Sequence, residues 1–175
     1  MIRALKYFAF SVFISSLPIG AALAAATVKP VNVNIINAEG RSVGTATLTE
    51  AEHGVKITLD IKSLPPGPHF LHIHQNPKCD APDFKSAGAH FDPTGNGHGS
   101  HGAAGLPAGD IPNFVLTVKE DGTAHVTVIA PNVTLGTEPN SVLSNEGTAM
   151  VIHAVADKVT DAAPPRIACG VIKKP

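Results

Sequence analysis

Residues 67–74 read Gly67-Pro-His-Phe-Leu-His-Ile-His74, and this stretch places His72 and His74 one residue apart. Successive side chains of a β-strand point to opposite faces, so these two imidazoles would share one face, roughly 7 Å apart. Two imidazoles on one face can bind a single transition metal, because imidazole suits copper, zinc, iron and nickel. An ordinary strand with two solvent-exposed histidines is the alternative that this stretch alone leaves open.

The rest of the chain adds further potential metal ligands. It has nine histidines, one tyrosine and no tryptophan, a composition weighted toward ligands. The residues that complete the inventory are His90, His98, His101, Asp110 and His153.

Short segments with alternating apolar and polar residues lie on both sides of residues 67–74. They occupy residues 28–37, 43–48, 55–61, 114–119, 124–129, 149–153 and 167–172. Turn signals rich in glycine and proline separate them, at residues 38–40, 53–54, 65–67 and 120–122. This pattern predicts an all-β fold, an antiparallel sandwich or barrel. Internal repeats and linkers are absent from the sequence, so we expect one domain.

The first residues have the layout of a secretory signal peptide. Arg3 and Lys6 precede a largely apolar run over residues 7–19, and residues 22–24 (Ala-Leu-Ala) form a small-x-small cleavage signal. We therefore expect a signal peptide over 1–24, or alternatively 1–26, and a single domain over 25–175. Removing residues 1–24, which hold two basic and no acidic residues, changes the formal net charge from −1 to −3. This charge argues against nucleic acid or an anionic membrane as a partner.

Export also bears on the two cysteines, Cys79 and Cys169. In an oxidising compartment two such residues favour a disulfide. Metal ligation by the cysteines is the weaker alternative, because neither belongs to a CxxC pair.

A long segment without strand pattern runs from residue 80 to residue 110. Residues 86–109 contain seven glycines together with His90, His98 and His101. Long loops inside a compact domain are usually functional or disordered. We expect a functional loop, with a disordered glycine- and histidine-rich linker as the alternative.

Four segments, in this order and spacing, carry a resemblance to a known family. They are residues 69–74 with Cys79 five further on, residues 87–93 (Ala-Gly-Ala-His-Phe-Asp-Pro), residues 109–113 (Gly-Asp-Ile-Pro-Asn), and residues 151–157 followed by 166–171. The chain resembles the bacterial periplasmic copper,zinc superoxide dismutases over essentially its whole mature length. The resemblance implies a Greek-key β-barrel of about eight antiparallel strands with long metal-binding loops, and a periplasmic location. It also implies a homodimer or a monomer.

The resemblance also implies roles for individual residues. His72, His74, His90 and His153 match the four copper ligands, and His90 would be shared between copper and zinc. The implied reaction converts superoxide to oxygen and hydrogen peroxide while copper alternates between Cu(II) and Cu(I). Arg166 matches the arginine that orients the substrate anion, and Asp157 matches an aspartate that links a copper histidine to a zinc histidine.

The expected zinc site is the main departure from the family pattern. His90, His98 and Asp110 fall at fitting positions, but Pro107 stands where a histidine is expected. Because zinc usually takes four ligands, we expect either that His101 replaces the missing histidine or that the site is weak or vacant. Two other functions remain as alternatives to the copper,zinc enzyme. They are a copper-only dismutase and a non-catalytic periplasmic copper-binding protein of the same fold.

Overall fold

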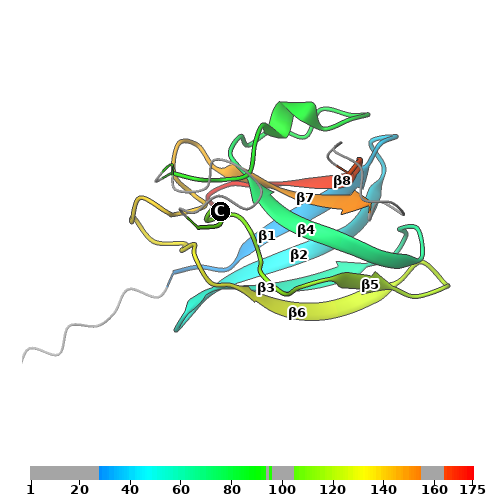
Figure 1. Ribbon diagram of the computed structural model, residues 1–175, viewed down its shortest axis with the longest axis horizontal. Coiled ribbons are helices and arrows are strands. Elements are labelled where there is room, and N and C mark those ends of the chain that lie inside the picture. The colour runs from blue at the N-terminus through cyan, green and yellow to red at the C-terminus, as the bar shows by residue number, and fades with distance from the viewer. Residues whose placement is uncertain (1–27, 94, 96–104, 155–163) are drawn as a thin grey trace, which may run out of the picture.

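The computed structural model describes residues 28–93, 95, 105–154 and 164–175 of the 175-residue chain. These residues form eight β-strands and one short 3-10 helix, η1 (Figure 1). The strands are β1 Val31–Asn37, β2 Ser42–Ala51, β3 Gly54–Ile61, β4 Gly67–His74, β5 Leu116–Val118, β6 Ala124–Ala130, β7 Thr148–Ala154 and β8 Arg166–Ile172, and η1 spans Lys85–Ala87. No helix within the described residues is long and apolar enough to cross a membrane.

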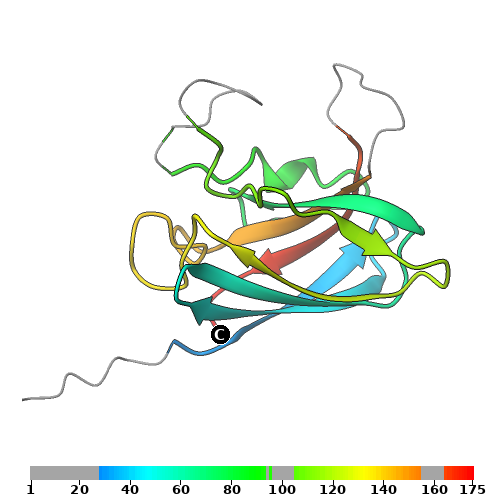
Figure 2. The same ribbon diagram turned by 60° about the horizontal axis from the view of Figure 1, so that its bottom comes forward.

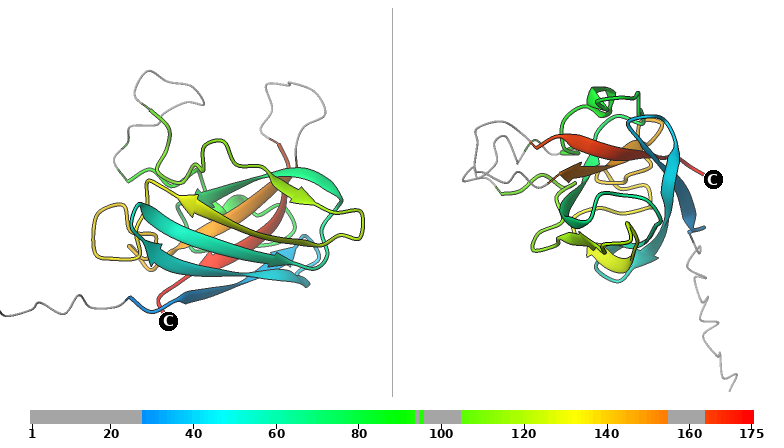
Figure 3. Two further views of the ribbon diagram at one scale, coloured as in Figure 1. Left: turned by 90° about the horizontal axis from the view of Figure 1, so that it is seen from below. Right: turned by 90° about the vertical axis from the view of Figure 1, so that its right-hand side faces the viewer.

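The strands form one antiparallel sheet in the order β5-β4-β7-β8-β1-β2-β3-β6. The sheet curls until its two end strands, β5 and β6, lie side by side without pairing, so the barrel is nearly closed (Figure 3). Across β7-β4-β5-β6 the fourth strand in sequence returns to lie beside the first, which is the Greek-key arrangement. The predicted all-β Greek-key fold is therefore confirmed.

The two-residue alternation that predicted the strands also builds the core. Strand β1 buries Val31, Val33 and Ile35 and exposes Asn32 and Asn34. Strands β2, β3, β4 and β7 add their own inward-facing aliphatic side chains to this interior. The alternation leaves polar side chains on the outside of the barrel, where their chemistry depends on what covers them.

Two strands are shorter than the sequence predicted. The expected strand over residues 28–37 begins at Val31, because Pro30 has no N–H to donate to a ladder and its φ is fixed. The strand expected over 114–119 is reduced to Leu116–Val118, which pairs with the start of β4. The site described below lies beyond the end of that short pairing.

The segment of residues 75–91, which follows β4, covers the outside of the barrel near β7 and β8 (Figures 1 and 2). Its η1 region is held by a small apolar cluster separate from the main core. In this cluster Phe84 and Ala87 are buried against Ala149, Val151 and Cys169, which lie on β7 and β8. Residues 84–91, called the cover segment below, thus form a second layer over this part of the sheet.

Candidate metal centre

Three histidines point outward from two neighbouring strands. On β4, His72 and His74 alternate with Leu71 and Ile73, which face the barrel interior. On β7, His153 has the same outward parity and lies opposite Phe70 of β4 in the ladder. His74 and His153 are nevertheless buried, with 0% and 4% of their surface exposed, because the cover segment lies over them. The predicted strand geometry of the two β4 histidines is confirmed.

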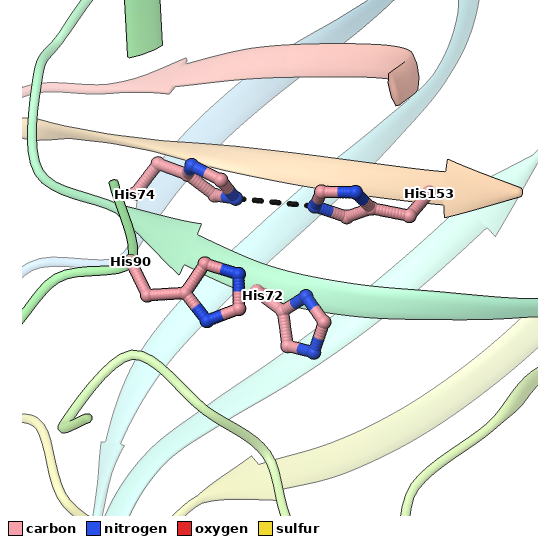
Figure 4. Close-up of side chains that lie close together, drawn as sticks. All are labelled: His72, His74, His90 and His153. Carbon is pink, nitrogen blue, oxygen red and sulfur yellow. Dashed lines mark hydrogen bonds between the residues drawn. The ribbon is translucent and has the colours of Figure 1, made fainter. Parts of the chain in front are cut away.

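A fourth histidine, His90, comes from the cover segment (Figure 4). The backbone of His90 forms an isolated antiparallel bridge with His74, and the Gln75 N–H donates to Ala89 O at 3.0 Å. The ring of His90 lies 4.3 Å from that of His72 and 4.8 Å from that of His74, centroid to centroid. Each of the four histidines offers a ring nitrogen, and these four atoms lie within 4.8 Å of one another. The four residues can therefore hold one metal ion.

The hydrogen bonds around these rings leave unprotonated nitrogens that face the centre of the histidine cluster. His74 Nδ1 donates to Gly88 O at 2.9 Å, and His153 Nδ1 donates to Pro164 O at 3.2 Å. A neutral imidazole carries one N–H, so in both rings the Nε2 atom is then bare. These two Nε2 atoms lie 3.1 Å apart, the contact dashed in Figure 4, and His72 Nδ1 is buried without a partner. Lone pairs placed in this way fit a metal cation between them.

The protonation of the rings also suits a metal. Burial away from water lowers the pKa of His72 to about 4, of His74 to about 3 and of His153 to about 4. The neighbouring His90 lowers all three further, and the carbonyl bonds of His74 and His153 oppose the shift only in part. At neutral pH these three histidines are uncharged, which is the form that binds metals.

On its other side, His90 is bonded to Asp110. His90 Nδ1 donates to Asp110 Oδ1 at 2.6 Å, and both side chains are partly buried. Asp110 itself forms an isolated backbone bridge with His72. Two of the residues expected at zinc are thus adjacent to each other and to the histidine cluster.

The remaining expected zinc residues, His98 and His101, lie outside the described residues. Pro107 is buried, and its carbonyl accepts the Asp110 N–H at 3.0 Å in a tight turn. The position where the family resemblance predicts a histidine therefore serves as a backbone support for Asp110.

Arg166 begins β8 and pairs with His153 across the ladder. Its two terminal nitrogens donate to Phe84 O and Gly88 O, each at 2.7 Å. Gly88 O therefore accepts hydrogen bonds from both the Arg166 guanidinium and the Nδ1–H of His74. Partial burial lowers the pKa of Arg166, and this arginine ties the cover segment to the edge of the site.

The predicted disulfide between Cys79 and Cys169 is present. It joins the segment that follows β4 to the middle of β8, with the two Cα atoms 5.6 Å apart. Cys79 packs at the edge of the apolar cluster that holds Phe84. The cover segment is thus attached to the barrel by an apolar cluster and Arg166, and the disulfide holds the chain just before it, at Cys79.

Sequence reasoning missed two glycines of the site. Gly88 supplies the shared carbonyl and has a φ of 79°, a backbone conformation that other residues rarely adopt. Gly109 lies so close to β4 that a Cβ on it would meet Ile73 O. Their closeness to candidate ligands could have marked them in the sequence, since Gly88 lies two residues before His90 and Gly109 directly before Asp110.

The other histidines among the described residues lie away from the cluster. His69 faces the barrel interior and its Nε2 donates to Pro65 O at 2.7 Å. His53 and His125 are exposed, on a turn and on β6. Asp157, expected beside the metal ligands, lies outside the described residues.

Comparison with known proteins agrees with this geometry. Residues 42–172 match the family model described as copper/zinc superoxide dismutase (SODC). The chain belongs to this family. It is 43% identical to superoxide dismutase [Cu-Zn] 2 of Aquifex aeolicus over 148 residues, covering 81% of this chain and 85% of the relative. It is 36% identical to superoxide dismutase [Cu-Zn] of Escherichia coli strain K12, covering 94% of this chain and 98% of the relative.

Solved structures show the same likeness. A superoxide dismutase-like protein from Bacillus subtilis superposes with a TM-score of 0.71 at 33% identity, covering 81% of this chain and 97% of that chain. The Cu/Zn superoxide dismutase from Brucella abortus superposes with a TM-score of 0.63 at 28% identity, covering 82% of this chain and 99% of that chain.

Proposed function

We propose that the protein is a superoxide dismutase whose copper ion is bound by His72, His74, His90 and His153. The observation that carries this proposal is the pair of bare Nε2 atoms of His74 and His153, 3.1 Å apart and buried, beside the unpartnered Nδ1 of His72. An all-imidazole ligand set suits copper, and membership in the copper/zinc superoxide dismutase family agrees with it. Bound copper would supply a one-electron couple, Cu(II)/Cu(I), for oxidising one superoxide and reducing the next.

The protein's own residues would attract the substrate and handle its protons. Arg166 is a permanent cation at the rim of the cluster, so it would draw the superoxide anion toward the histidines. We expect His90 to hold the transferable proton at Nε2. Asp110 occupies its Nδ1 side, which leaves Nε2 as the ring nitrogen that can exchange a proton.

Metal analysis combined with a superoxide assay tests this proposal. The purified mature protein should bind one copper ion per chain and remove superoxide. Chelating the copper should abolish the activity, and adding copper back should restore it. Tight copper binding by the four histidines without dismutation would instead favour the non-catalytic copper-binding alternative.

For zinc we propose a site made by His90, His98 and Asp110, with His101 as the replacement for the histidine that Pro107 displaces. Asp157 would link the two sites by accepting one ring N–H from a copper histidine and another from a zinc histidine. The adjacency of His90 and Asp110 supports the proposal. His101→Ala should then lower zinc affinity sharply, whereas His53→Ala, at an exposed turn, should not. Equal, tight zinc binding in wild type and His101→Ala would refute the role of His101.

We also propose that the protein is exported to the periplasm, with residues 1–24 or 1–26 removed and 25–175 forming the mature domain. The disulfide supports this, because such bonds persist in oxidising compartments. Cell fractionation, with mass analysis of the mature N-terminus, tests the location and the cleavage site together. An uncleaved cytoplasmic product would contradict the proposal.

A further inference from the structure

We infer that a backbone clamp centred on Gly109 holds the Asp110–His90 pair in place, so that the four histidines are arranged for copper without zinc. This inference rests on the proposed function, because it concerns the same copper ligands. It goes further by assigning to Gly109, Asp110 and Pro107 a positioning role that is independent of the second metal.

The clamp is a closed ring of three backbone hydrogen bonds. The Phe91 N–H donates to Ile73 O at 2.8 Å, the Gly109 N–H donates to Phe91 O at 2.7 Å, and the Ile73 N–H donates to Gly109 O at 2.9 Å. The three residues come from β4, from the cover segment and from the end of the long loop, and all three are buried. Three segments far apart in the sequence are thus fixed to one another at a single point.

The chain neighbours of the ring residues are the site residues. Ile73 lies between His72 and His74, Phe91 directly follows His90, and Gly109 directly precedes Asp110. Phe91 and Ile73 face the core, so in extended backbone their neighbours point the opposite way. The ring therefore presents His90 and Asp110 on the same outer side as the β4 histidines.

Asp110 then fixes the ring orientation of His90. Its carboxylate accepts the Nδ1–H at 2.6 Å and is only 18% exposed, which makes this a strong, charge-assisted bond. With the proton of His90 held at Nδ1, its Nε2 is bare, as a metal ligand requires. Asp110 is itself supported by its N–H bond to the carbonyl of Pro107, whose ring restricts the turn. Pro107, which takes the place of an expected zinc ligand, thus restricts the backbone turn that holds Asp110 against the proposed copper ligand His90.

Gly109 is the part of the clamp that tolerates no side chain. A Cβ at this position would lie 2.1 Å from Ile73 O and 3.0 Å from Phe91 N, both backbone atoms. Since neither atom can move as a side chain does, Gly109→Ala must push the three segments apart. Gly136 offers a control, because its φ lies outside the left-handed region and a Cβ there would meet only the movable carboxylate end of the exposed Glu138.

The test measures copper affinity and the Cu(II) spectrum in protein freed of zinc by a chelator, with the metal itself as the probe. Asp110→Ala and Gly109→Ala should each weaken copper binding about 10- to 100-fold and change the electron paramagnetic resonance signal. Asp110→Asn keeps an acceptor oxygen for His90 Nδ1 but loses the charge, so its copper affinity should lie between those of Asp110→Ala and wild type. Gly136→Ala should resemble wild type.

The outcomes separate this inference from the proposed function. Unchanged copper affinity and spectrum in Asp110→Ala would overturn the clamp while leaving copper at the four histidines, and Asp110→Ala decides the matter if Gly109→Ala fails to fold. Wild type that binds copper only after zinc is added would also overturn it. Wild type that binds no copper with or without zinc would overturn the proposed function itself.

Discussion

Two outer faces of this barrel share one strand geometry and differ in what lies over them. The open face is formed by outward side chains of β1, β2, β3 and β6. The covered face is formed by those of β4 and β7. On the open face, Asn32 pairs with Thr47 and Thr58 with Thr127, each at 3.1 Å and in contact with solvent. On the covered face, His74 and His153 occupy equivalent outward positions and are buried.

The comparison shows that a layer over the sheet, rather than the strand pattern, distinguishes the two faces. His125 on β6 has the outward parity of His153 on β7, yet His125 is exposed to solvent. The covered face carries the cover segment, held by Phe84, by the disulfide and by Arg166. Burial by this segment lowers the histidine pKa values and leaves ring nitrogens for a metal.

The largest effect should come from exchanging one histidine on each face for alanine. His153→Ala removes one of the four proposed copper ligands and should abolish dismutation and weaken copper binding, while the fold and disulfide remain. His125→Ala, the same substitution on the open face, should leave activity and copper content unchanged. Activity assays with metal analysis of both variants check this. Near-normal activity of copper-loaded His153→Ala would remove this residue from the ligand set.

Much of this arrangement could be predicted from the sequence, because strands leave a two-residue pattern. That pattern gave the β4 strand and placed His72 and His74 on one face, opposite His69. The role of His90 as a copper ligand came from the family resemblance, since loop residues carry no periodicity. The shared carbonyl of Gly88 and the contact of Gly109 with Ile73 O could not be predicted. They depend on backbone bonds between distant segments, which side-chain patterns do not encode.

The disulfide should have the next largest effect, because it anchors the cover segment. Replacing Cys79 and Cys169 together by serine should lower the free energy of unfolding by roughly 4–5 kcal/mol in the chain-entropy model for a 90-residue separation. Chemical denaturation of the metal-free protein measures this. Copper affinity should fall as well, since the cover segment would be less firmly held. An unchanged unfolding midpoint would show that packing alone holds the segment.

Arg166 should affect rate more than metal binding. Arg166→Ala keeps the four histidines but removes the cation, so dismutation should slow about tenfold or more and become less sensitive to ionic strength. Arg166→Lys keeps the charge but replaces the planar guanidinium that bonds Phe84 O and Gly88 O, so it should restore the salt dependence only in part. An unchanged rate and salt dependence in Arg166→Ala would make this arginine structural only.

The last effect is a pH dependence of the free energy of unfolding, which the covered face alone should produce in metal-free protein. In the unfolded chain the histidines take up protons near pH 6.5, whereas burial holds the pKa of His72, His74 and His153 at about 3 to 4. Between these values the unfolded state binds more protons, so the free energy of unfolding falls as the pH is lowered. Each buried histidine contributes up to about 1.4 kcal/mol per pH unit in that window.

The pH range between the folded and unfolded pKa values of the histidines lies above the range in which the carboxylates affect stability. The pKa values of Asp83, Asp121 and Glu138 are lowered by hydrogen bonds in the folded state from ordinary values of 3.8, 3.8 and 4.5. Stability from these groups is lost only at more acidic pH, as the pH falls below those values. Denaturation of metal-free protein between pH 7 and pH 5 therefore reports the buried histidines. His153→Ala should flatten the slope there and His125→Ala should not; equal slopes in both variants would show that the covered face does not hold its histidines neutral.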